Sequence, residues 1–156
     1  ILLSLPKTIK KNKPIYSKKM KTKKTFIFAG LSILIAVVLG AMGAHYLKET
    51  LAYPLVKIES WKTAVQYQLF HGLALLILIL IQLYFKELVL NRAILFIKIG
   101  MTLFAGSIYL LTLNYSFQIE ILPKILGPMT PIGGLFMILG WGAFVLSVIK
   151  VDLENE

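Results

Sequence analysis

Four long apolar stretches constrain this chain more than any other feature. They cover residues 26–44, 64–85, 93–113 and 132–149. A helix needs about 20 predominantly apolar residues to cross a bilayer. Backbone N–H and C=O groups in lipid must be paired within the segment, so each stretch is predicted to be a helix. The expected fold is therefore all-α, an integral membrane four-helix bundle with the lipid bilayer as its main partner.

Composition supports lipid over water as the solvent. Hydrophobic residues make up 58% of the chain and charged residues 15%, whereas about a quarter of a soluble domain is charged. Lys98 lies inside the third stretch, but the surrounding leucine, isoleucine and phenylalanine residues outweigh its insertion cost of about 3 kcal/mol. The third stretch is therefore still expected to insert.

The chemistry available to this chain is narrow. It has no cysteine, which excludes thiol catalysis, Cys-based zinc sites and iron–sulfur clusters. It also lacks a phosphate-binding loop and a dinucleotide fingerprint. Ser107 and His71 have no nearby acid that would complete a catalytic triad. We therefore expect no enzymatic activity, no metal and no cofactor.

Positive charge is concentrated at the start of the chain and predicts its orientation. Residues 1–24 contain nine lysines and no acid, within a net charge of +10. Basic flanks remain in the cytoplasm, so four crossings would leave both termini cytoplasmic. The expected organisation is a basic cytoplasmic tail (1–24), a transmembrane domain (25–149) and a short acidic cytoplasmic tail (150–156). Because Met20 precedes Lys21-Thr22-Lys23-Lys24 as an ordinary start would, one hypothesis is that residues 1–19 are not native.

The basic tail also suggests a partner. Lysines near a membrane surface gain about 1 kcal/mol each from anionic lipid head groups. Nucleic acid is not expected, because no aromatic or arginine-rich reading surface accompanies the lysines.

Proline and threonine predict the breaks between helices. Tyr53-Pro54 is expected to interrupt the first outer loop. Thr130 is expected to cap the fourth helix, with Pro131 at its first position.

Small residues recur at helix-packing intervals, which lets helix backbones approach closely in lipid. Two faces are predicted to pack in this way, one on the first helix and one on the fourth. The first consists of Ala36, Gly40 and Ala44, and the second of Gly133, Gly140 and Ser147. Trp61 is expected in the outer aromatic belt, and Trp141, in the middle of its helix, should need an N–H partner inside the bundle.

Polar side chains inside the predicted helices gather in the outer half of the membrane, and such residues often carry function. Gln68 and Tyr67 lie three and four residues before His71, so the three share a helical face. Two interpretations stay open, an outward-facing polar pocket and an interhelical hydrogen-bond network that only holds the bundle together. The candidate residues are His45, Tyr67, Gln68, His71, Ser107, Tyr109 and Thr130.

Four motifs resemble a known family. They are residues 40–45 (GAMGAH), 61–68 (WKTAVQYQ) leading to His71, 106–111 (GSIYLL), and 130–135 (TPIGGL) followed by Gly140-Trp141. In this order they are similar to the small YgdD-like inner-membrane proteins of domain-of-unknown-function family 423. The long basic tail, Tyr46 and Ala105 depart from the family pattern. The resemblance implies a plasma-membrane (bacterial inner-membrane) location, and it brings no assigned reaction or ligand.

The leading expectation is a multi-pass plasma-membrane component without enzymatic activity, carrying an outward-facing polar cluster. One alternative is a small-solute or ion permease acting as a homo-oligomer, since four short helices rarely enclose a path alone. The nearly apolar inner half counts against conduction, because a path needs polar lining through its whole depth. The other alternative is a haem-binding redox subunit that uses two histidines as axial ligands.

Overall fold

The computed structural model describes residues 13–85 and 88–154, with side chains described over 22–85 and 88–151. Its elements are α1 (Lys13–Met42), a π-helical continuation η1 (Gly43–Thr50), α2 (Leu55–Tyr84), α3 (Asn91–Phe117) and α4 (Ile121–Glu154). The predicted all-α fold is confirmed. Four helical spans are long and apolar enough to cross a membrane, namely Thr22–Thr50, Leu55–Tyr84, Asn91–Phe117 and Ile121–Val151.

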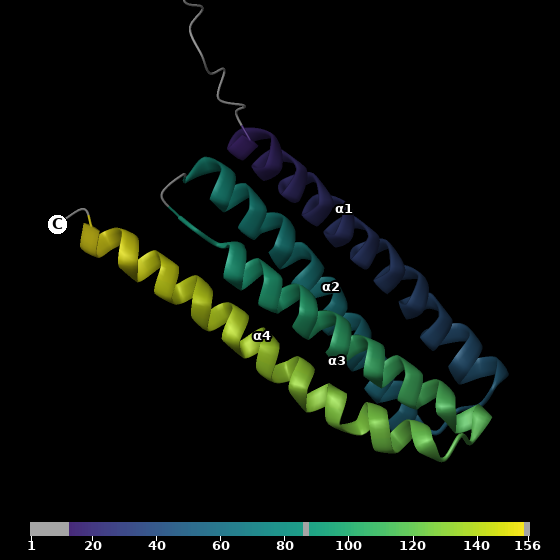
Figure 1. Cartoon of the computed structure of the whole chain (residues 1–156). Coiled ribbons are helices and arrows are strands. Elements are labelled where there is room, and N and C mark those ends of the chain that lie inside the picture. Colours follow the sequence, from purple (N-terminus) through teal and green to yellow (C-terminus); the bar gives the residue numbers. More distant parts are fainter. Residues whose placement is uncertain (1–12, 86–87, 155–156) are drawn as a thin grey trace, which may run out of the picture.

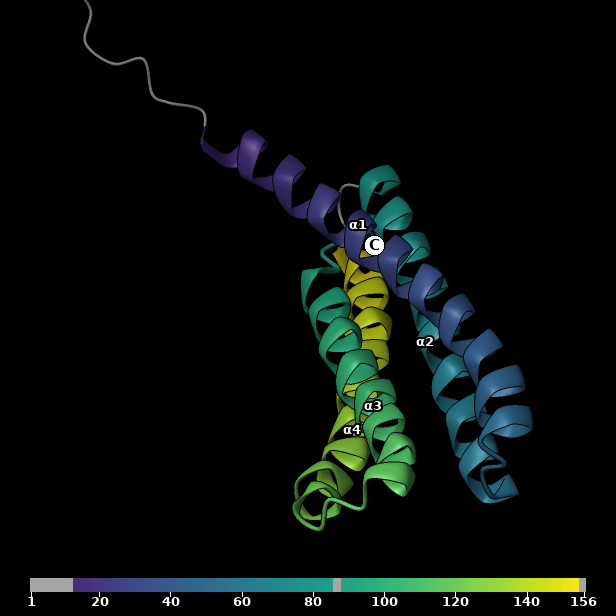
Figure 2. The same ribbon diagram turned by 90° about the vertical axis from the view of Figure 1, so that its right-hand side faces the viewer.

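The helices form a row of antiparallel neighbours. Helix α1 packs on α2, α2 on α3, and α3 on α4. Figure 1 shows the start of α1, the end of α4 and the α2–α3 connection at one end of the molecule, which we call the terminal end. The α1–α2 and α3–α4 connections lie at the opposite end, which we call the loop end. In the side view, the first turns of α1 project beyond the other helices (Figure 2).

Large apolar surfaces remain uncovered on these helices. Only 22% of the most apolar window of the α1 span and 17% of that of α4 is buried within the molecule. Soluble monomers rarely expose continuous apolar surface of this extent. The exposed faces are therefore surfaces for lipid, which leaves packing and hydrogen bonds to hold the helices together.

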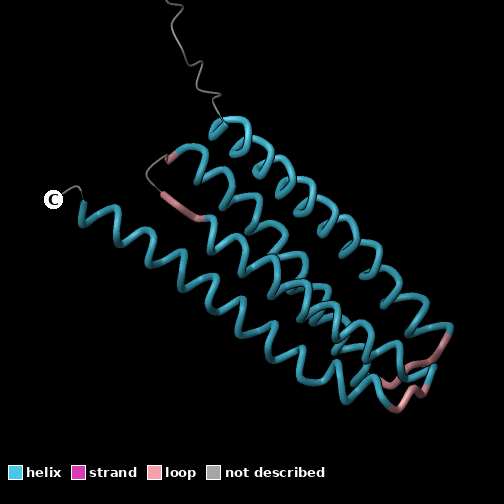
Figure 3. The backbone as a smooth tube through the Cα atoms, viewed as in Figure 1, coloured by secondary structure: helices cyan, strands magenta, loops and turns pink. Residues whose placement is uncertain are grey.

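All four helices are longer than the apolar stretches that predicted them, and the connections are correspondingly short (Figure 3). The predicted break at Tyr53-Pro54 is confirmed, because Pro54 precedes the first residue of α2 with extended backbone angles. Residues 13–24 of the basic tail form the first turns of α1. Residues 1–12, and the side chains of Asp152, Glu154 and Glu156 in the acidic tail, lie outside the described part of the chain.

The predicted start of the fourth helix at Thr130 is wrong. Helix α4 begins at Ile121 and contains Pro128 and Pro131 in its interior. Proline removes one backbone hydrogen bond, but membrane helices tolerate it where neighbouring groups satisfy the freed carbonyl. The tight connection instead depends on Asn114, whose Oδ1 accepts the Ile119 N–H at 2.9 Å. Gln118 supplies the left-handed backbone that the turn needs, with φ of 54°.

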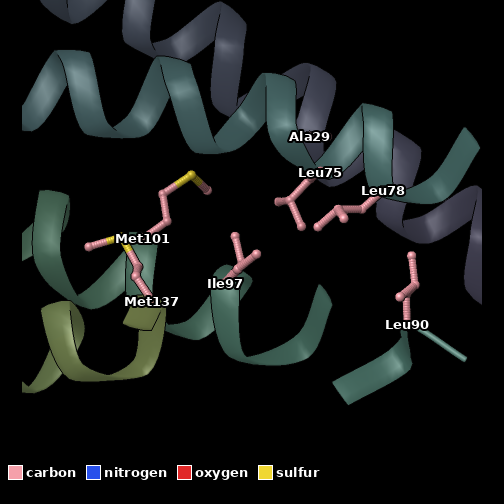
Figure 4. Close-up of a cluster of buried hydrophobic side chains, with 7 residues drawn as sticks. All are labelled: Ala29, Leu75, Leu78, Leu90, Ile97, Met101 and Met137. Atoms are coloured by element: carbon pink, nitrogen blue, oxygen red, sulfur yellow. The ribbon is translucent and has the colours of Figure 1, made fainter. Parts of the chain in front are cut away.

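The core consists of two clusters of buried apolar side chains. One lies toward the terminal end and joins all four helices through Ala29, Leu75, Leu78, Leu90, Ile97, Met101 and Met137 (Figure 4). The other lies toward the loop end, around Leu47, Tyr53, Ile58, Trp61, Ala64, Ala105 and Tyr109. Polar groups enter the interior mainly between and beside these clusters.

The α3–α4 interface is a contact between backbones. A Cβ atom on Gly133 would lie 2.5 Å from the Phe104 nitrogen, and one on Gly100 would lie 2.6 Å from the Met137 nitrogen. A Cβ on Gly140 would lie 2.6 Å from Cγ1 of Ile97. The structure thus places Gly133 and Gly140 directly against α3. Ser147, on the same face, donates its hydroxyl to the Ala143 carbonyl at 2.8 Å.

The predicted face of the first helix needs correction at one position. Ala36 is buried and Gly40 contacts Val65, but Ala44 is exposed. Gly43 takes the expected place of Ala44, since a Cβ atom on Gly43 would overlap the Trp61 ring. A residue eight positions along an α-helix points about 80° past two full turns, whereas a residue seven positions along points only about 20° short of two full turns. Position 43 therefore continues the line from Ala36, and position 44 faces away from α2.

Candidate functional site

Gln68 is the centre of the polar cluster and joins three helices. Its side chain is only 8% exposed. Its Nε2 donates to the Ser32 carbonyl of α1 at 2.9 Å, and its Oε1 accepts the Tyr109 hydroxyl of α3 at 2.8 Å. A buried amide requires partners for both ends, and here each end is bonded to a different helix.

Trp61 extends this arrangement toward the loop end. The indole N–H donates to the Leu39 carbonyl of α1 at 2.7 Å, and the ring centroid lies 4.6 Å from that of Tyr109. The residue is 1% exposed, so its prediction as part of an outer aromatic belt is wrong. The sequence signal that was available is the small residue Gly43, which leaves space for this ring.

Ser107 and Thr130 connect α3 to α4. The Ser107 hydroxyl donates to the Phe104 carbonyl at 3.0 Å, so it accepts the Thr130 hydroxyl at 2.7 Å. The structure thus brings these two predicted residues together. Thr130 bonds across the helix interface from the interior of α4, and it is not a helix cap.

His71 uses both ring nitrogens, Nδ1 within α2 and Nε2 toward α4. Nδ1 lies 2.8 Å from the Tyr67 carbonyl, which is an acceptor, so this nitrogen carries the proton. Nε2 then accepts the Trp141 indole N–H at 3.3 Å, so Trp141 has a partner on a neighbouring helix although it is 39% exposed. The Tyr67 ring stacks on the imidazole with centroids 5.7 Å apart and also contacts Phe104 of α3. The described geometry fits a neutral histidine.

His45 does not join the other predicted residues. Its side chain is 75% exposed and pairs with Glu49 on the same helical turn at 3.4 Å. Gly72, the neighbour of His71, lies against Ile33 of α1. His45 is twelve residues beyond Ile33, which corresponds to about 18 Å along a helix. The two histidines therefore do not form a pair that could hold one metal ion or haem iron between them.

The described cluster has the chemistry of a hydrogen-bond network that holds helices together. The hydroxyl, amide and imidazole groups of Gln68, His71, Ser107, Tyr109 and Thr130 are all bonded to a neighbouring helix or to local backbone. Within the described residues, no group of three or more His, Asp or Glu side chains lies close enough to hold a metal ion. Sequence reasoning missed Ser32, Leu39 and Trp61, because two of these supply backbone carbonyls, which any residue has.

The fold and the site define the class of protein. It is a multi-pass membrane protein whose four helices face lipid and are joined by interhelical hydrogen bonds. The family model described as "Protein of unknown function (DUF423)" matches residues 39–134, which is more than half of the chain. The chain belongs to this family, as the sequence motifs indicated.

Relatives are found in bacteria and in a yeast. A UPF0382 membrane protein of Staphylococcus epidermidis is 38% identical over 128 residues, covering 81% of this chain and 97% of that protein. A UPF0382 membrane protein of Schizosaccharomyces pombe is 38% identical over 121 residues, covering 76% and 95%. The UPF0382 inner membrane protein YgdD of Escherichia coli is 31% identical over 136 residues, covering 87% and 97%. No solved structure matches this chain.

Proposed function

We propose that this chain is a non-enzymatic component of the plasma membrane, with both termini in the cytoplasm and a polar cluster that ties its helices together. The location is supported by the name of the Escherichia coli relative, an inner membrane protein. The orientation is supported by the nine lysines of residues 1–24, which precede the first apolar stretch. On this topology the terminal end is cytoplasmic and the basic tail contacts anionic lipid head groups.

The observation that supports a structural role is the pair of hydrogen bonds made by the Gln68 side chain. Its amide links α1 to α2 and α2 to α3, and neither end remains free for a solute. A ligand pocket would present polar atoms that lack protein partners in the empty state. The cluster instead uses its polar atoms between helices, where a membrane protein lacks a hydrophobic driving force for association.

A double-mutant cycle between Gln68 and Tyr109 tests this proposal. Gln68→Leu, Tyr109→Phe and the double variant are compared with the unchanged protein in detergent, without added ligand, by denaturant titration. We expect a coupling energy of about 0.6 kcal/mol, the average for interhelical hydrogen bonds in a membrane protein, and of at most about 1.7 kcal/mol. Tyr115→Phe is the matched control, because Tyr115 lies on the same helix with 44% of its surface exposed. It should leave stability unchanged.

Other results would favour the other functions. If the cluster binds a solute, the cycle should show no coupling energy between Gln68 and Tyr109. A small molecule should then co-purify with the unchanged protein and be lost from Gln68→Leu. Solute flux in proteoliposomes that Gln68→Leu removes would indicate a permease. A Soret band in the purified protein would indicate haem, although an iron on His71 would have to displace one of its two hydrogen bonds.

A further inference from the structure

A crevice opens at the terminal end, away from the polar cluster. It has a volume of about 450 Å³ and lies between the start of α3 and the last turns of α4. Its lining consists of Val89, Arg92, Ala143, Leu146, Ser147, Lys150 and Val151. The Ser147 hydroxyl, which donates to the Ala143 carbonyl, lies 3.3 Å from the Val89 carbonyl, so α4 lies close to the segment that precedes α3.

The charged groups of the crevice are both cations. Arg92 is the second residue of α3, and Lys150 lies in the last turns of α4. The ion pairs among the described side chains are His45–Glu49 and Lys62–Glu59, and neither involves the crevice. The start of α3 adds to the positive potential, since its cap residue Leu90 provides no side-chain acceptor for the first N–H groups.

Apart from Ser147, the remaining side chains of the crevice walls are apolar and continue into the lipid-facing surface. Val89 is 65% exposed and Leu146 is 60% exposed. Further along α4, Leu139 and Ile138 are also exposed on the helix surface. A site with cations beside an apolar surface matches a molecule with an anionic head and hydrocarbon chains. A soluble anion would leave the apolar walls without a function.

We propose that this crevice binds an anionic phospholipid, with the phosphate between Arg92 and Lys150 and the acyl chains along α4. Basic pockets between transmembrane helices are a recognised kind of lipid head-group site. The residues that line the crevice belong neither to the polar cluster nor to the basic tail. It requires only that the chain sits in a bilayer, so it stands for either orientation of the protein.

Lipid retention by the full chain tests the proposal. The protein is purified in mild detergent and titrated with phosphatidylglycerol or phosphatidylcholine, and bound lipid is counted by native mass spectrometry. We expect phosphatidylglycerol to bind preferentially. The double variant Arg92→Gln, Lys150→Gln should bind it about thirtyfold more weakly, from the usual contribution of two cations near a lipid surface. The matched control is Lys57→Gln, Lys124→Gln, which removes two cations at the loop end and should leave binding unchanged.

A second variant keeps both charges and reduces the space. Val89→Trp places a large side chain at the crevice wall from an exposed position, so the fold should persist and phosphatidylglycerol binding should fall. Glycerol 3-phosphate, added at millimolar concentration, should not displace the lipid, because it lacks the acyl chains.

Four outcomes would overturn the lipid site. They are equal binding of phosphatidylcholine, equal loss in the control variant, full binding by both crevice variants, and displacement by glycerol 3-phosphate. The last would mean that the crevice takes a soluble phosphate. Gln68→Leu leaves the crevice residues intact and should therefore bind phosphatidylglycerol normally. The same assay thus distinguishes a change in the polar cluster from a failure of the lipid site.

Discussion

Gly133 and Gly134 are adjacent in α4 and have opposite surroundings. A Cβ on Gly133 would meet the backbone of α3 at 2.5 Å, while a Cβ on Gly134 would meet nothing within 4 Å. Gly133→Ala should therefore lower stability by about 1–3 kcal/mol, because backbone cannot move aside as a flexible side chain can. Gly134→Ala should leave stability unchanged or raise it slightly. Thermal unfolding in detergent measures both, and equal midpoints for the two variants would contradict the close α3–α4 contact.

At the same scale, sequence spacing predicted part of the site. Tyr67 and His71 share a face and do stack, because residues four apart are neighbours on any helix. Spacing along one helix gives no information about which neighbouring helix covers that face. Ser107 and Thr130 therefore could be proposed as members of the cluster, but their mutual bond could not be predicted. His45 was wrongly grouped with the cluster, because its position near the predicted end of the first helix did not reveal which way it faces.

At the scale of the element, Gly43, the first residue of η1, is the residue of the first span that packs against Trp61 of α2. Gly43→Val should displace the Trp61 ring, weaken its bond to the Leu39 carbonyl and lower stability by about 1–3 kcal/mol. Ala44→Val, one residue further along at an exposed position, should change stability by less than about 0.5 kcal/mol. Titration with sodium dodecyl sulfate measures both variants. A larger loss for Ala44→Val would restore the originally predicted face.

The number and type of the helices could be predicted from the sequence, and their ends could not. Hydropathy detects the part of each helix in hydrocarbon, but helix formation continues into polar residues such as Lys23 and Lys24 at the surface. Thr130-Pro131 has the pattern of a helix start in water. Within lipid the cost of an unpaired backbone favours a continuous helix, and α4 therefore begins nine residues before Thr130, at Ile121.

For the whole molecule, the absence of native cysteine makes the orientation directly measurable. Single variants Lys57→Cys and Lys124→Cys report on the loop end, and Lys24→Cys and Lys150→Cys report on the terminal end. A membrane-impermeant maleimide added to intact cells should label the first pair only. The second pair should become labelled after the membrane is permeabilised. The reverse pattern would place the termini outside and would contradict the proposed topology.

The row in which each helix packs on the one that precedes it has a consequence for biogenesis. From α2 onward, each helix finds a packing partner in the helix made just before it. No early segment has to wait for the last one to close a ring. The Gln68 amide can bond to Ser32 before Tyr109 has been translated. It can then bond to Tyr109 before Thr130 has been translated. Native contacts can therefore accumulate in the order of synthesis, as each segment enters the bilayer.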